Sequence, residues 1–233
     1  MLDPRSMLRG SSDPPTQRTS RAGVPPIHAA TAATSPDILR VGAWSAMVAV
    51  VDDVLRPAED ASYEAQLGRP AMDERDRELA ARMIGRTLRG QCAVAVRCGW
   101  GLPAVLRVSP RLEDGRPFPT LFWLACPVAS RWVGRVEAQG AMTGLSQRLR
   151  DDEALAEAYA AAADRYVAAR DTLGGPLPSD AAAGGMPTRV KCLHALYAHH
   201  LATRDNPIGA WVGEQVEPLR CPEPCAALTE EGP

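Results

Sequence analysis

One short segment, residues 189–200, gathers the residue types best suited to chemistry. It contains three of the four histidines, the only lysine of the chain (Lys191) and the cysteine Cys192. A thiol beside an imidazole can act as a nucleophile, because the imidazole takes up and returns the proton. In an enzyme, Cys192 would be the nucleophile, with His194 or His200 as acid or base. A structural core cysteine is the simpler interpretation, because free cysteines are mostly buried and inert.

Helical spacing limits these roles, because residues 188–203 are predicted to form a helix. At about 100° per residue, His200 lies on the apolar face, whereas His199 points outward. A hydrogen-bonded core histidine is therefore the favoured interpretation of His200. Cys192 and His194 do not face each other on a regular helix. A direct pair between them requires the helix to begin late or to distort.

Charged residues could bind a small anionic metabolite, and the candidates are Arg97, Arg111, Asp114, Glu137, Arg189 and Lys191. An arginine fork matches a carboxylate or phosphate, and a helix N-terminus attracts an anion. We expect the proline-stiffened loop 110–119, the strand end near Arg97 and the start of the helix at 188 to converge on one pocket. In the competing interpretation the loop is a rigid connection with solvated charges, and Glu137 pairs with an arginine at the surface.

A zinc site is a further hypothesis. Its ligands would be Cys98, Cys126, Cys192 and His194. The spacing supports it poorly, because no two cysteines are separated by two residues. Cys221 and Cys225 have three residues between them, in the C-terminal tail. Structural cysteines are therefore favoured, and no cofactor is predicted.

The patterns of apolar residues predict an α+β fold in which helices cover a small antiparallel sheet of about three strands. The expected strands are residues 92–98, 104–109 and 120–125. The expected helices are residues 73–84, a helix after Pro127 that breaks near Gly140, a helix that opens at 151–153, and residues 188–203.

The chain is expected to divide into three parts. Residues 1–71 form an extension whose beginning is too rich in Pro, Ser, Thr and Arg to offset chain entropy, so we expect disorder with one short apolar segment at 41–55. Met72 precedes an acid-rich turn typical of a natural start, so the alternative is that the extension is not translated in the native protein. Residues 72–212 form one α+β domain, and residues 213–233 form a mobile acidic tail.

Composition limits the class of protein. The 233 residues are 45% hydrophobic and carry a formal net charge of −2. A run of about 18 uncharged apolar residues is absent from the sequence, so no membrane span is predicted. A near-neutral chain lacks the charge that neutralises nucleic-acid phosphates. The six cysteines are irregularly spaced and the N-terminus lacks the apolar stretch of a secretory signal, so we expect a cytoplasmic protein with reduced thiols.

Several motifs occur in an order that resembles one family. They are RCGWGLP (97–103), PRLEDGRPFPT (110–120), LACP (124–127), RVEAQG (135–140), GGMPTRVKCLH (184–194) and Asn206-Pro207. On these residues the chain resembles the bacterial, mainly actinobacterial, family known as domain of unknown function 501. The resemblance covers the chain from Asp73 to Trp211, and the order and spacing of the motifs make it specific.

The resemblance implies a cytoplasmic bacterial protein without an established activity. Family genes often lie beside genes for a septum-formation initiator and an exopolyphosphatase, which points to division, envelope or phosphate physiology. The alternative to a metabolite-binding protein is therefore a non-enzymatic adaptor or regulator that binds a division or envelope protein. Family members often have a cysteine where this chain has Trp100, which further weakens zinc ligation by Cys98.

Overall fold

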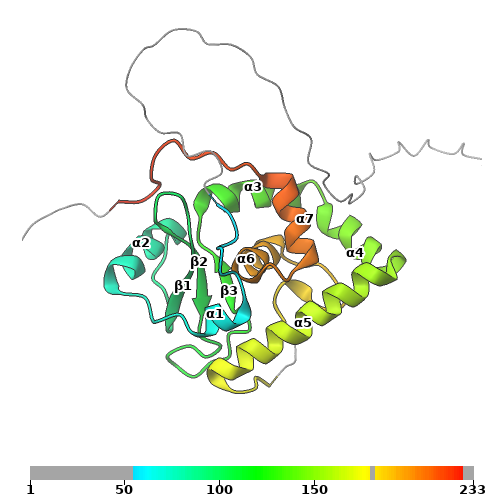
Figure 1. The fold of residues 1–233 in the computed structure, drawn as a ribbon, viewed down its shortest axis with the longest axis horizontal. Coiled ribbons are helices and arrows are strands. Elements are labelled where there is room, and N and C mark those ends of the chain that lie inside the picture. The colour runs from blue at the N-terminus through cyan, green and yellow to red at the C-terminus, as the bar shows by residue number, and fades with distance from the viewer. Residues whose placement is uncertain (1–54, 179–181, 228–233) are drawn as a thin grey trace, which may run out of the picture.

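The computed structural model describes residues 55–178 and 182–227. The predicted apolar segment at 41–55 lies outside these residues except for Leu55. A sheet stands at one side of the molecule and most helices at the other, with α6 (Leu193–Thr203) between them (Figure 1). The predicted α+β class is confirmed. Within the described ranges, no helix is both long and apolar enough to cross a membrane.

The sheet is antiparallel, in the order β1 (Cys92–Arg97), β2 (Pro103–Val108) and β3 (Phe122–Leu124). A tight turn joins the first two strands, because Gly101 adopts a φ of 75° that side chains disfavour and its N–H donates to the Cys98 carbonyl at 2.8 Å. The three predicted strands are confirmed, and the third is shorter than predicted.

Seven α-helices lie in the described residues. They are α1 (Tyr63–Leu67), α2 (Glu74–Ile84), α3 (Pro127–Ala138), α4 (Ala141–Asp151), α5 (Glu153–Gly174), α6 and α7 (Pro207–Val216). A short 3-10 turn, η1, spans Ala183–Gly185. The predicted break near Gly140 is confirmed, because this glycine adopts a φ of 82° between α3 and α4.

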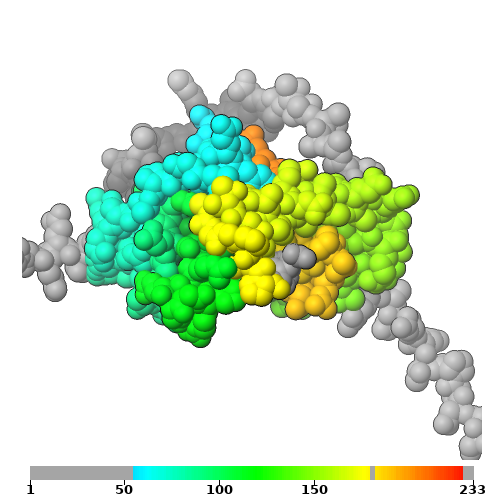
Figure 2. Space-filling model, turned by 90° about the horizontal axis from the view of Figure 1, so that it is seen from below, coloured from blue at the N-terminus to red at the C-terminus, as the bar shows by residue number. Residues whose placement is uncertain are grey.

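The helix α6 is the centre of the body, and it contacts the sheet and the helices α1, α3 and α7. Most of its side chains are buried. Gly209 lets α7 cross it closely, because a Cβ at this position would lie 2.1 Å from the Leu196 carbonyl oxygen. The segment that leads into α6, residues 182–192, lies at the surface beside α4 and α5 (Figure 2). The start of α6 therefore packs on the core, and the segment that precedes it is open to solvent.

Residues 55–71 belong to the packed body, although they were predicted to form part of a disordered extension. Leu55 is fully buried. The buried amide of Gln66 donates hydrogen bonds to the carbonyl oxygens of Ala202 at 3.0 Å and Ala95 at 3.4 Å. The helix α1, which contains Gln66, therefore joins α6 to the edge strand β1. The packed body begins no later than Leu55.

The C-terminal tail is also packed for part of its length. The helix α7 continues to Val216, and Leu219 and Cys221 are buried beyond it. The indole N–H of Trp100, in the turn between β1 and β2, donates to the Cys221 carbonyl at 3.0 Å. The prediction therefore placed the start of the mobile tail too early, at residue 213. The first part of this segment ends α7 and contacts the turn between β1 and β2.

Candidate functional site

The N-terminus of α6 carries the residues that the sequence singled out. Cys192 is the N-cap, and its extended backbone (φ −148°, ψ 107°) leads the chain into the helix. Two side chains from other helices fix this approach. Glu137 of α3 accepts the Leu193 N–H at 2.7 Å, and Ser146 of α4 accepts the Val190 N–H at 3.1 Å. These tertiary hydrogen bonds compete with helix formation before Leu193.

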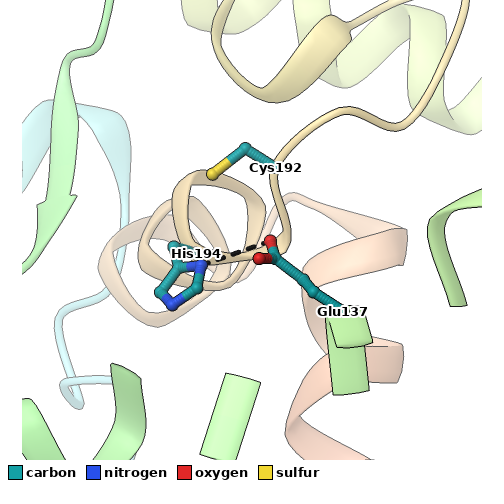
Figure 3. Close-up of side chains that lie close together, drawn as sticks. All are labelled: Glu137, Cys192 and His194. Atoms are coloured by element: carbon teal, nitrogen blue, oxygen red, sulfur yellow. Dashed lines mark hydrogen bonds and ion pairs between the residues drawn. The ribbon is translucent and has the colours of Figure 1, made fainter. Parts of the chain in front are cut away.

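The helix predicted to start at residue 188 therefore begins late, and this brings Cys192 and His194 together. Each offers a ligand atom that lies within 4.8 Å of the other and of a Glu137 carboxylate oxygen (Figure 3). We call these three side chains the Glu–Cys–His cluster. The late helix start thus places the two side chains near each other, which a regular helix through both residues would not do.

The orientation of the His194 ring is set by α3. Its Nδ1 atom lies 3.2 Å from Glu137 Oε1, and its Nε2 atom lies 3.0 Å from the carbonyl oxygen of Ser130. A carbonyl oxygen only accepts, so Nε2 carries a proton and donates it. The Nδ1 atom is consequently the one that faces the cluster.

The cluster favours an ion pair between the thiol and the imidazole. Burial alone would raise the pKa of the Cys192 thiol, but the His194 ring and the Ala195 N–H outweigh it, so this pKa is lowered. Interaction with Cys192 is the main reason that the pKa of His194 rises to about 9, and Glu137 adds to it against the effect of burial. Cys192 is partly exposed, so a small reagent can reach its sulfur atom.

A basic groove begins one residue before the cluster. It lies between α4 and the segment that leads into α6, is open to solvent, and has a volume of about 490 Å³. Its cations are Arg150, Arg189 and Lys191, and Thr143 and Ser146 add hydroxyl groups. Arginine and lysine side chains placed in this way attract carboxylates and phosphates.

A comparison with family models matches residues 94–214, more than half of the chain, to DUF501, described as a protein of unknown function. The chain belongs to the DUF501 family. The resemblance to this family that the sequence motifs indicated is therefore confirmed. The matched residues include the whole Glu–Cys–His cluster and the whole basic groove. No curated protein and no solved structure matches the chain significantly.

Three other candidate residues for anion binding are not brought to the cluster. Arg97 forms a two-pronged ion pair with Asp76 of α2, at 2.5 and 2.8 Å. Arg111 donates to carbonyl oxygens at the end of α5 and beyond it. Asp114 pairs with the neighbouring Arg116 and with Arg89. The expected convergence on one pocket therefore does not occur, because each of these charges is satisfied by its own local partner.

A larger hollow of about 540 Å³ lies along the edge strand β1, and Arg97 lines it. Its charges largely cancel in pairs, because Arg69 binds Asp60 and Arg97 binds Asp76. The basic groove differs from this hollow, because three cations and no acidic side chain line it.

Helical spacing predicted that His200 lies on the inner face of the last helix and that His199 points outward. The structure shows the reverse. His199 is fully buried, whereas His200 is only half-buried. His200 is not part of the cluster, and burial lowers its pKa. The core histidine is His199, whose ring stacks on Phe122 of β3 with centroids 5.9 Å apart. The prediction was wrong because α6 is covered on nearly all sides, so its apolar side chains do not define a single inner face.

The remaining predicted zinc ligands lie away from the cluster. Cys98 is buried at the end of β1, and Cys126 is buried at the N-cap of α3. Cys126 Sγ accepts the Ala129 N–H at 3.5 Å. In the part of the chain that the structure describes, the Glu–Cys–His cluster is the group whose ligand atoms are close enough to hold a metal ion. The structure thus brings Glu137 to Cys192 and His194 in place of the two strand-end cysteines.

Sequence reasoning identified Cys192, His194 and Glu137 but missed the residues that position them. Ser130 contributes only a backbone carbonyl, which leaves no mark in the sequence. Ser146 accepts a single backbone N–H, and serine is common on helix surfaces. Such contacts depend on how α3 and α4 pack against α6, and no local pattern shows them.

Proposed function

We propose that the chain binds a small anionic metabolite in the basic groove and that the Cys192 thiolate is the reactive group beside it. One observation carries this proposal: the lining of the basic groove includes Lys191, and the next residue, Cys192, belongs to the Glu–Cys–His cluster at the N-terminus of α6. Backbone N–H groups at such a terminus favour a negative charge. Arg189 and Lys191 line the groove and directly precede Cys192 in the chain, so one ligand in the groove could extend to the thiol.

The arrangement suits transfer of a group from the ligand to sulfur. The Cys192 sulfur would form a bond to an electrophilic carbon or phosphorus atom of the ligand, and the bond from that atom to the leaving group would break. His194 would donate its Nδ1 proton to the leaving group. Glu137 would hold the imidazolium in place during this step, because its carboxylate lies 3.2 Å from Nδ1.

An adaptor for a division or envelope protein would need an extended apolar surface. In the described part of the chain, Trp132 is the large hydrophobic residue left exposed, at 43%. The guanidinium of Arg135 lies 4.3 Å from the centre of its ring and covers part of it. A single aromatic side chain supports partner binding less than the groove supports ligand binding.

Two alkylating reagents that differ in charge test this proposal. Iodoacetate is anionic and iodoacetamide is neutral, and both alkylate thiolates with loss of iodide. We expect the ratio of their rates, measured for each cysteine by peptide mass spectrometry in the presence of a chelator, to be higher at Cys192 than at the exposed Cys225. The reason is that the groove concentrates the anionic reagent near Cys192.

Charge reversal supplies the matched variant. The double variant Arg189→Glu/Lys191→Glu is expected to lower the iodoacetate-to-iodoacetamide ratio at Cys192 about 5-fold at low ionic strength. The ratio at Cys225 should not change. Equal ratios at the two thiols of the wild-type protein, or an unchanged ratio at Cys192 in the double variant, would show that the groove does not recruit anions to the thiol.

A further inference from the structure

We infer that the Glu–Cys–His cluster is also a site for a divalent metal ion of the zinc class, ligated by Glu137, Cys192 and His194. Metal binding goes beyond the proposed function, because it depends on the three ligand atoms and not on the cations of the groove. It would make Cys192 a ligand in place of a free nucleophile, and it would thereby control the proposed thiol chemistry.

The first argument is the orientation of the imidazole. Metal-bound histidines almost always donate their second ring N–H to a carbonyl or carboxylate, which fixes the ring and leaves the other nitrogen for the metal. His194 already has this arrangement, since its Nε2 atom lies 3.0 Å from the Ser130 carbonyl oxygen. Its Nδ1 atom is directed at Glu137 and Cys192 (Figure 3).

The second argument is the orientation of the carboxylate. Glu137 Oε1 accepts the Leu193 N–H at 2.7 Å, which anchors the side chain across the gap between α3 and α6. A carboxylate held in this way by one hydrogen bond presents a fixed donor to a metal, and its second oxygen offers another. The ligands therefore come from two helices that are already packed together, so little ordering is left for the metal to impose.

The third argument is the donor set and its spacing. Sulfur, nitrogen and oxygen in one group are the ligands that zinc takes in proteins, at about 2.0–2.3 Å. A tetrahedral zinc ion would place these atoms about 3.3–3.8 Å apart. In the protein they lie within 4.8 Å of one another, so side-chain movements of about 1 Å would close the site. A thiolate and a carboxylate would together neutralise the charge of the ion.

The number of ligands indicates what the site could do. Structural zinc sites are closed by four protein ligands, whereas catalytic sites have three and keep one position open. This cluster supplies three. An oxygen of the anionic ligand could take the fourth position, and only this last step rests on the proposed function.

A competition titration of the full chain tests the inference. The metal-free protein is titrated with Zn²⁺ against a chromogenic chelator, and separately with Co²⁺ while the absorption spectrum is recorded. We expect one ion per chain and a sulfur-to-cobalt charge-transfer band. Cys192→Ser and His194→Gln should each weaken binding about 100-fold or more, and Glu137→Gln about 10-fold or more.

Controls separate the cluster from the other thiols and from misfolding. Cys126→Ser and Cys225→Ser should leave zinc affinity and the cobalt band unchanged. Circular dichroism identifies any variant that fails to fold, and Cys192→Ala then serves as a second variant without the sulfur ligand. Absence of binding by the wild-type protein, or binding that survives Cys192→Ser but disappears in Cys225→Ser, would overturn the inference. The alkylation ratios described above are measured with a chelator present, so failure of the metal site and failure of the proposed function give different results.

Discussion

A chain that starts at Met72 is expected to lose roughly 5 kcal/mol of unfolding free energy, or to fail to fold, because residues 55–71 complete the core. Burial of Leu55 contributes about 1.5–3 kcal/mol of this. The two hydrogen bonds of Gln66 contribute about 1 kcal/mol each, and their loss leaves two carbonyl oxygens without these donors. The shortened chain also lacks Tyr63, whose hydroxyl is the hydrogen-bond partner of the buried His199. Urea denaturation followed by circular dichroism measures the loss.

Point variants in α1 separate the packed contacts from the effect of length. Gln66→Ala is expected to cost about 2 kcal/mol, whereas Glu64→Ala, at an exposed position of the same helix, should change stability by less than about 0.5 kcal/mol. A chain that starts at Asp53 keeps Leu55, Tyr63 and Gln66 and serves as the control for length. If the chain that starts at Met72 were as stable as the one that starts at Asp53, the packing of residues 55–71 on the body would be refuted.

Acid is expected to destabilise the protein through His199, by about 2 kcal/mol between pH 7 and pH 5. The amide of Asn206 donates to His199 Nδ1 at 3.0 Å, because its oxygen already accepts the Gly209 N–H. The neutral ring therefore accepts at Nδ1 and donates from Nε2 to the Tyr63 hydroxyl, 2.5 Å away. A second proton at Nδ1 would face an N–H donor inside the core.

The sign of the pH effect follows from these contacts. Burial, together with the charges of His200 and Arg165, lowers the pKa of His199 in the folded protein to about 3. The unfolded chain has an ordinary histidine pKa of about 6.5. As pH falls below this value, the unfolded state binds the proton first, and stability is lost progressively until pH approaches the folded pKa. The tyrosines beside the ring stay neutral across this range.

A substitution isolates the contribution of His199 from that of the carboxylates. His199→Gln is less stable at pH 7, but its stability should fall by about 2 kcal/mol less than that of the wild type between pH 7 and pH 5. His200→Gln should keep the loss that is due to His199 and remove only the contribution of His200, whose pKa burial also lowers. Parallel stability curves for the wild type and His199→Gln would mean that His199 is not held neutral in the core.

The sheet could be predicted because its signals are local. The apolar residues of 92–98 alternate in the sequence as a strand requires, although irregularities after Val94 interrupt the register with β2, and the turn residue Gly101 separates the first two strands. Gly140 likewise divides two helices by its own conformation. The position of α1 could not be predicted, because a five-residue helix is stabilised by the strand and helix that it touches and not by its own pattern.

The candidate site could be predicted in its residue types but not in its geometry. The sequence placed Cys192 and His194 on one helix, where they would point apart. Their contact depends on Glu137 and Ser146, which hold the chain out of the helix until Leu193. Arg97 and Arg111 were expected to join them. Arg97 instead binds Asp76, and Arg111 donates to carbonyl oxygens at the end of α5 and beyond it. Long-range side-chain partners of this kind are set by the packing of the whole body.

The central claim, that Glu137, Cys192 and His194 act as one group, is tested most directly by NMR titration of His194 in the metal-free protein. The account predicts a pKa of about 9 for His194 in the wild type. It predicts a lower value in Cys192→Ala, because the thiolate is the main cause of the rise, and a smaller decrease in Glu137→Gln. A His194 pKa near 6.5 in the wild type, unchanged in both variants, would contradict the account.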